Sequence, residues 1–241
     1  MHPKDGNNDK RRRASRRRAP EATRLALVEA TVDLVRASGV HGTTVDQICT
    51  AAGATKGAFF HYFRSKEDIL EAAILHWCRE QAEGYGRDLG EETDDPLVRL
   101  DRMLDGLAAS VRVPGEKTAC LLGMVAQELA GSNHRVRAVC EQMLDGWTDL
   151  VAGLLAEAKR RHSPGTDFNP HEVAWMLNSL WQGSLLAAKT RQDPELVASN
   201  LVHARAYVSG LFGVDSPKQN SRKSREVSST PGLLRHYLEN H

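Results

Sequence analysis

The chain of 241 residues is 41% hydrophobic and 26% charged, with a formal net charge of +1. This composition is typical of one or two domains that bury a core. No run approaches the roughly 18 apolar residues of a membrane-spanning helix, and the N-terminus lacks the apolar segment of a secretory signal. Four cysteines without CxxC spacing favour reduced thiols over a disulfide framework or a zinc site. We therefore expect a cytoplasmic protein with no membrane partner, metal or cofactor.

The first 20 residues carry eight lysines and arginines against two aspartates, although the whole chain is nearly neutral. Because this segment is poor in apolar residues, we expect a disordered basic arm over residues 1–20. Its run KRRRASRRR can follow phosphates or enter a DNA minor groove, so it indicates an anionic partner. A solvated tail without a function is the alternative.

Residues 21–38 are predicted to form the first helix of a domain, because apolar side chains recur there at helical spacing and Gly39 follows. The next stretch, TTVDQICTAAGATKGAFFHYFRSK over residues 43–66, predicts two short helices joined by a tight turn. Thr44 or its neighbour Thr43 can cap the first short helix, and Gly53 is placed where that helix must end. Such a pair is typical of a helix-turn-helix, whose second helix lies in the DNA major groove.

The second short helix, residues 56–62, has residue types suited to contacts with DNA, and we call it the reading helix. Thr55 can cap it, Lys56 gives its start a positive charge, and two small residues let the backbone approach DNA closely. Phe59 and Phe63 are four residues apart and are predicted to face the core. Phe60 and the two aromatic residues after it are left to point outward or sideways. A small helical bundle with aromatic filler is the alternative.

The longer stretch TTVDQICTAAGATKGAFFHYFRSKEDIL resembles the DNA-binding domain of the tetracycline-repressor (TetR) family of bacterial transcription regulators, over about residues 24–75. The shared pattern is a Thr-rich cap, an apolar helix, Ala-Gly-x-Ser/Thr-x-Gly, an aromatic cluster and a Ser-Lys-Glu-x-Leu start of the next helix. Phe60 departs from it, because the family most often has a tyrosine there whose hydroxyl contacts a phosphate. The resemblance implies a repressor that binds a palindromic operator in double-stranded DNA. The residues expected to contact DNA are Thr43, Thr44, Thr55, Lys56, Gly57, Ala58, Phe60, His61, Tyr62 and Lys66.

From Lys66 an apolar pattern continues to about Gln81, which predicts a helix long enough to leave the DNA-binding domain. In the resembled family this helix joins the two domains. Residues 84–95 break the periodicity, so we predict a helix-turn-helix domain over residues 21–81 and a ligand-binding and dimerisation domain over residues 82–213.

The second domain is predicted to contain five further helices, over residues 96–113, 117–130, 133–161, 171–189 and 193–212. Together with the four N-terminal helices this makes about nine helices and no convincing strand, so the expected fold class is all-α. The last segment, residues 214–241, is rich in Ser, Lys and Arg and is expected to be a disordered tail.

The helix over residues 171–189 is apolar nearly all round, so more than one of its sides must be buried. Gly183, Ser184, Ala187 and Ala188 form a ridge of small residues along it, and the last helix has one apolar face. Two such helices from each chain would form a symmetric four-helix interface, as the resembled family does. We therefore expect a homodimer, with a large monomer core as the alternative.

The second domain concentrates Cys, Met and Trp on its helices, which is typical of the wall of an apolar cavity with a few polar anchors. The resemblance implies a small-molecule effector, of unknown identity, that releases the operator by shifting the dimer to another form. Ordinary core packing is the alternative for any single residue. The candidate ligand-binding residues are Cys120, Met124, Gln127, Met143, Trp147, Trp175, Asn178 and Trp181.

Two alternatives to a reversible effector remain. Cys120 begins a stretch, CLLGMVAQEL, that is similar to one in some electrophile-responsive or metabolite-responsive family members, so it could be a thiol sensor. Only Lys117 flanks it to lower its pKa, which favours reversible binding. A regulator or architectural DNA-binding protein without an effector would instead have a filled second domain. The chain has no HExxH, GxSxG, P-loop or Rossmann motif, so we do not expect an enzyme.

Overall fold

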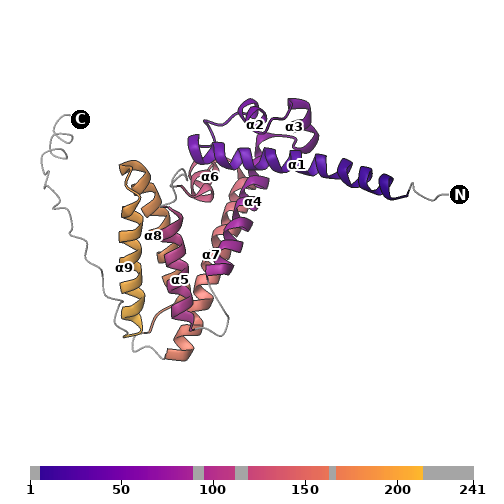
Figure 1. Ribbon diagram of the computed structural model, residues 1–241. Helices are drawn as coiled ribbons and strands as arrows, with labels where there is room; N and C mark the ends of the chain where they lie inside the picture. Colours follow the sequence, from indigo (N-terminus) through magenta and orange to yellow (C-terminus); the bar gives the residue numbers. More distant parts are fainter. Residues whose placement is uncertain (1–5, 89–94, 112–118, 163–166, 214–241) are drawn as a thin grey trace, which may run out of the picture.

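The computed structural model describes residues 6–88, 95–111, 119–162 and 167–213, with the backbone alone for residues 6–19, 85–86 and 88. Within these ranges the chain forms nine α-helices and no strand (Figure 1), which confirms the all-α prediction. The helices are α1 (Gly6–Ser38), α2 (Val45–Ala51), α3 (Lys56–Tyr62), α4 (Lys66–Asp88), α5 (Pro96–Ser110), α6 (Leu121–Leu129), α7 (His134–His162), α8 (Pro170–Arg191) and α9 (Glu195–Leu211). No helix in the described ranges combines the length and apolar character of a membrane span.

The N-terminal domain consists of α1, α2, α3 and the first turns of α4. In Figure 1, α1 lies across the top of the molecule and carries α2 and α3 on its outer side. The core of this domain is built from large, fully buried side chains, among them Leu27 on α1, Ile48 on α2, Phe59 on α3 and Ile69 on α4. Each of the four helices contributes at least one buried apolar side chain to this core, so the core fixes the orientation of α3 in the domain.

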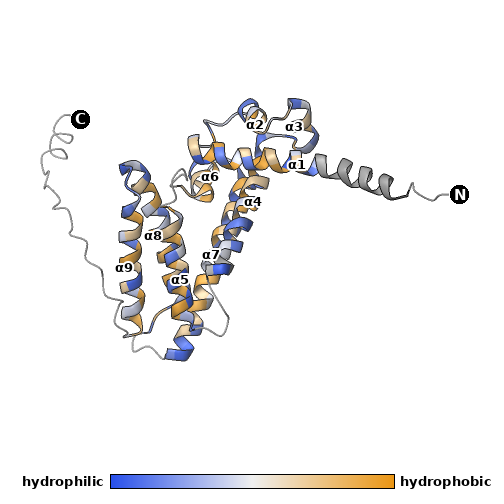
Figure 2. Cartoon of the chain, in the orientation of Figure 1, coloured by the Kyte–Doolittle hydropathy of each residue, from blue (hydrophilic) through white to orange (hydrophobic). Residues whose placement is uncertain are grey.

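The C-terminal domain is a bundle in which α5, α7, α8 and α9 run side by side, and the short α6 lies between this bundle and α1 (Figure 1). Its core includes the fully buried side chains of Met103, Leu155, Leu177 and Leu201. In Figure 2 the helices carry hydrophobic and hydrophilic residues on different sides, as amphipathic helices around a core do.

Two helices extend beyond their predicted ends. Helix α1 begins at Gly6 and continues through Pro20, so residues 6–20 are helical and not the disordered arm that we expected. The run of Arg, Lys and Ala accounts for this, because these residues have high helix propensity. Helix α4 was expected to end near Gln81 but continues to Asp88, into the predicted break at residues 84–95, since the cost of about 1 kcal/mol for a helical glycine is small. The boundary near residue 82 stays a prediction, and the tail over residues 214–241 lies outside the described residues.

Candidate DNA-binding surface and ligand cavity

The helix-turn-helix is fixed by the local signals that the sequence contains. Thr44 is the N-cap of α2, and its side chain and that of Gln47 form a reciprocal capping box. Gly53 follows α2 with a φ of +60°, a conformation that costs glycine little and other residues more. Thr55 is the N-cap of α3, where its hydroxyl accepts a hydrogen bond from the N–H of Ala58 at 3.1 Å. These caps begin α3 at Lys56 and leave its first turn on the surface.

The aromatic residues of α3 divide between the core and the surface as predicted. Phe59 and Phe63 are buried in the domain core, with exposed fractions of 0% and 4%. Phe60 is 58% exposed and packs edge-on against Phe59, while His61 is exposed and Tyr62 is half-buried beside it. The outward side of α3 therefore presents flat aromatic surface next to the exposed Thr55, Lys56 and Gly57.

Two of the candidate DNA-contact residues have structural partners instead. Thr43 is 1% exposed and its hydroxyl donates to the carbonyl of Gly39, so it is a buried support and not a surface residue. The ammonium of Lys66 donates to the carbonyl of Val40, in the turn between α1 and α2. Lys66 thus stabilises this turn, and the predicted phosphate contact would need its side chain to move.

The ammonium of Lys56 is the cation at the start of α3, and it is paired with a carboxylate of α2. Its Nζ lies 2.7 Å from Oδ1 of Asp46, with side chains that are 63% and 66% exposed. The hydrogen bond to Asp46 raises the pKa of Lys56, so the ammonium keeps its charge at neutral pH. Because exposed ion pairs contribute little, a DNA phosphate can compete with Asp46 for this ammonium.

Replacing Lys56 with alanine is expected to weaken operator binding and to reduce the slope of log affinity against log salt by about one. Asp46→Asn should have the opposite effect on affinity, because it removes a negative charge near the phosphates and frees Lys56. Both side chains are exposed, so the helical content should not change. The measurement is a salt titration of operator binding for the three proteins. Equal operator affinities of the native protein and Lys56→Ala at moderate salt would show that Lys56 does not contact DNA.

A cavity of about 430 Å³ lies in the C-terminal domain, between α4, α6, α7 and α8. Five of the predicted ligand-binding residues line it: Cys120, Met143, Trp147, Asn178 and Trp181. A regulator without an effector was expected to have a tightly packed second domain with no cavity, so the presence of this cavity argues against that alternative. Its volume is in the usual range for sites that bind small molecules, about 300–1,000 Å³.

Three other candidates lie elsewhere. Met124 and Gln127 line a smaller cavity of about 140 Å³, and Trp175 is 41% exposed on the outer side of α8. Conversely, the prediction missed Trp77, Cys78 and Gln81 of α4, which form one wall of the main cavity. The Trp77 position belongs to the apolar pattern of α4, but periodicity alone gives no sign that this helix reaches across to α7.

The cysteines are all free thiols and are all shielded to some degree. Burial raises the pKa of Cys78 to about 12 and that of Cys140 to about 11. Burial also raises the pKa of Cys120, although Nε2 of Gln182 lies 3.5 Å from its sulfur. Since the thiolate is the reactive form, the burial and raised pKa of Cys120 argue against a role as an electrophile sensor.

Alkylation of the native protein by iodoacetamide at pH 8 is therefore expected to be slow at Cys78, Cys120 and Cys140. With a pKa near 11, Cys140 has a thiolate fraction roughly a hundredfold or more below that of an ordinary cysteine, whose pKa is about 8.5. Mass spectrometry of the modified sites measures the rates, and the same protein in urea, where the thiols are exposed, is the control. Rapid modification of Cys120 in the native protein would support the alternative that Cys120 is a thiol sensor.

Helix α6 connects the cavity to the DNA-binding domain. Cys120, at its N-cap, lines the cavity, and Glu128, near its other end, reaches the turn between α1 and α2. The carboxylate of Glu128 accepts hydrogen bonds from the backbone N–H of Val40 at 2.8 Å and of His41 at 2.9 Å. The ring of His41 is also within 2.6 Å of this carboxylate.

The environment of Glu128 favours its charged form. Burial acts against the carboxylate, but the N–H groups of His41 and Val40 and the His41 ring outweigh it, so the pKa of Glu128 is lowered. A second connection links α7 to α4, where the guanidinium of Arg135 donates to Asp68 and Glu71, each at 2.8 Å. The two domains are thus joined by charged hydrogen bonds as well as by apolar packing.

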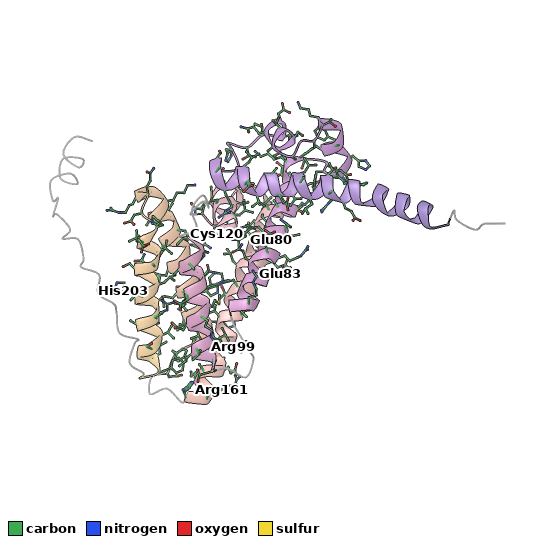
Figure 3. The ribbon with its side chains drawn as sticks, viewed as in Figure 1. Glu80, Glu83, Arg99, Cys120, Arg161 and His203 are labelled. Atoms are coloured by element: carbon green, nitrogen blue, oxygen red, sulfur yellow. The ribbon has the colours of Figure 1, made fainter. Side chains whose placement is uncertain are left out.

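The outer side of α8 and α9 is apolar and uncovered in the single chain. The exposed fractions are 41% for Trp175, 37% for Met176, 55% for Leu186 and 48% for Tyr207. Gly183 is exposed in the same stretch, and no atom lies within 4 Å of the position that a β-carbon would occupy there. In Figure 3, where His203 marks α9, this helix lies at the edge of the molecule, away from the α4–α7 side.

An exposed reading helix on a helix-turn-helix, joined to a helical domain with a cavity, defines a DNA-binding transcriptional regulator. The sequence matches the family model described as bacterial regulatory proteins, tetR family, over residues 27–73. It also matches the model described as tetracyclin repressor-like, C-terminal domain, over residues 96–204. The chain therefore belongs to the TetR family of bacterial transcription regulators, which are DNA-binding proteins and not enzymes.

Individual relatives agree with this assignment. The transcriptional regulator AcuR of Cereibacter sphaeroides is 29% identical over 188 residues, which cover 77% of this chain and 86% of AcuR. The HTH-type transcriptional repressor DhaR of Mycobacterium sp. (strain GP1) is 26% identical over 172 residues, 71% of this chain and 85% of DhaR. The crystal structure of regulatory protein TetR from Rhodobacter sphaeroides is 27% identical, with a TM-score of 0.64 over 78% of this chain and 96% of that one. Reduced E. coli NemR, at 22% identity and a TM-score of 0.69, covers 82% of this chain and 99% of its own and shares the fold.

Proposed function

We propose that the protein is a homodimeric repressor that leaves a palindromic operator when a small effector occupies the main cavity. One observation carries this proposal. Two of the four helices that line the cavity, α4 and α6, also contact the DNA-binding domain. Trp77 and Gln81 of α4 line the cavity, and the same helix begins beside α3 at Lys66. An effector that moves α4 or α6 therefore changes the position of the reading helix.

The two forms of the dimer would differ in the distance between their reading helices. A dimer reads two half-sites about one DNA turn apart, so only one spacing fits the operator. An effector that binds the other form more tightly shifts the population toward it, and the loss of operator affinity can be no larger than that preference. The exposed Thr55, Lys56 and Gly57 and the outward side of Phe60 supply the surface for DNA.

Screening a panel of metabolites against the protein bound to a selected operator tests this function. An effector should quench tryptophan fluorescence and release the operator over the same concentration range, because Trp147 and Trp181 line the cavity. Trp147→Ala should weaken both effects. Met124→Ala is the matched control, because Met124 lies in the smaller cavity and should leave both nearly unchanged. Full potency of the effector on Trp147→Ala would place its site elsewhere.

A further inference from the structure

The main cavity carries no charged side chain on its described walls. Its apolar surface comes largely from three tryptophans, Trp77, Trp147 and Trp181, with leucines and a methionine between them. The polar groups on its walls are two thiols, three indole N–H groups and four carboxamides, those of Gln81, Gln142, Asn178 and Gln182. Carboxamides donate and accept hydrogen bonds but cannot neutralise an ion.

The carboxamide of Asn178 is held in a defined orientation. It is 3% exposed, and its Nδ2 donates to Oγ1 of Thr148 at 3.1 Å. The hydroxyl of Thr148 donates in turn to the carbonyl of Leu144 at 2.9 Å, so it can only accept from Asn178. These hydrogen bonds direct an N–H of Asn178 to Thr148, and because Asn178 lines the cavity we infer that its carbonyl oxygen is left to accept from a ligand.

Ionisable groups gather instead in a second cavity, of about 400 Å³, between α1, α4 and the bundle. Four residues, Trp77, Gln81, Cys120 and Trp181, line both cavities. The charged or titratable residues that line the second cavity are Glu29, Asp33, Arg36, His76 and Glu80. Figure 3 shows Glu80 on α4 at the level of Cys120, close to the DNA-binding domain. Charged side chains therefore line the second cavity and are absent from the described lining of the main one.

We propose that the main cavity takes an uncharged, largely apolar molecule with a hydrogen-bond donor and excludes organic ions of similar size. This inference rests on the proposed function, because it names the class of effector for the same cavity. An ion buried against these apolar walls would lose hydration without gaining an opposite charge from the described lining residues, which is unfavourable. A neutral molecule loses little on entering and can donate to the fixed oxygen of Asn178.

Two fluorescent probes with the same ring system test the inference. N-phenyl-1-naphthylamine is neutral and has one N–H donor, and 8-anilinonaphthalene-1-sulfonate has the same skeleton with an added sulfonate. The neutral probe should bind the native dimer about a hundredfold or more tightly than the sulfonate, because the described lining residues supply no countercharge. Fluorescence titrations of both probes give the ratio.

Three variants locate the binding and identify its cause. Gly146 lines the cavity and has open space around its β-position, so Gly146→Trp should fill the cavity and abolish binding of the neutral probe. Gly153→Trp, on the same helix and equally open, is outside the cavity and should bind normally. Met143→Lys places a cation on the cavity wall with a side chain of similar length, so it should reverse the preference between the two probes.

The inference would be overturned by equal affinities for the two probes, by no binding of the neutral one, or by binding that survives in Gly146→Trp. The same preparations are assayed for operator binding, which tests the proposed function separately. A protein that binds the neutral probe but no DNA sequence selectively would contradict the proposed function and leave the inference standing. A protein that releases its operator in response to an effector but binds both probes equally would support the proposed function and contradict the inference.

Discussion

Replacing Gly183 with arginine is expected to convert the dimer to a monomer and to abolish high-affinity binding to a palindromic operator. Gly183 lies on the exposed side of α8, between Trp175 and Leu186, on the face that we assign to the dimer interface. Two copies of an unpaired charge near the two-fold axis would cost several kcal/mol, in order of magnitude. A monomer has one reading helix and cannot span two half-sites.

The isolated subunit should tolerate this change, which separates a loss of assembly from a loss of folding. Nothing lies within 4 Å of the β-position of Gly183, and arginine is a better helix former than glycine by up to about 1 kcal/mol. Gly153→Arg on α7 is the matched control, because Gly153 is equally exposed and open but lies on another helix. Sedimentation velocity measures the assembly of both variants. A Gly183→Arg protein that sediments as a dimer would show that this face is not the interface.

The parts of the structure that the sequence predicted correctly are those that depend on local interactions. The hydroxyls of Thr44 and Thr55 cap helices only a few residues away, so their side chains and the following backbone suffice to predict α2 and α3. The burial of Phe59 and Phe63 follows from their spacing of four residues on one side of a helix.

The errors arise where partners are distant in the chain or where a helix has two apolar sides. The sequence suggested that Lys66 is a surface cation. Its acceptor, the carbonyl of Val40, lies 26 residues earlier in the chain, in the turn before α2, so no local pattern reveals the contact. Trp175 and Trp181 both lie on α8, but six residues of helix place them on different sides. Only the packing of α7 against α8 shows that Trp181 faces the cavity and Trp175 faces outward.

Replacing Glu128 with alanine is expected to uncouple effector binding from operator release. Glu128 is the contact through which α6, with Cys120 of the cavity at its other end, holds the turn before α2. Without its carboxylate, the N–H groups of Val40 and His41 lose their acceptor, which should lower the stability of the domain contact by about 1–3 kcal/mol. The ratio of operator affinities without and with effector should then fall toward one, because coupling is limited by contacts that differ between the two forms.

The neighbouring residue provides the control, and acidic conditions provide an independent check. Gln127→Ala removes an exposed side chain one position earlier and should keep the full response. Because the pKa of Glu128 is lowered in the folded protein, its stabilising contribution is present at neutral pH and is lost as the pH falls through that lowered value.

Binding of the effector and release of the operator must be measured separately on each variant. Tryptophan quenching reports occupancy of the cavity, since Trp147 and Trp181 line it and Glu128 does not. We expect Glu128→Ala to bind the effector with nearly unchanged affinity while its operator complex no longer responds. If Glu128→Ala releases its operator over the same effector range as the native protein, α6 is not the connection, and the remaining route is α4 with its hydrogen bonds to Arg135. Arg135→Ala would then be the variant that loses the response.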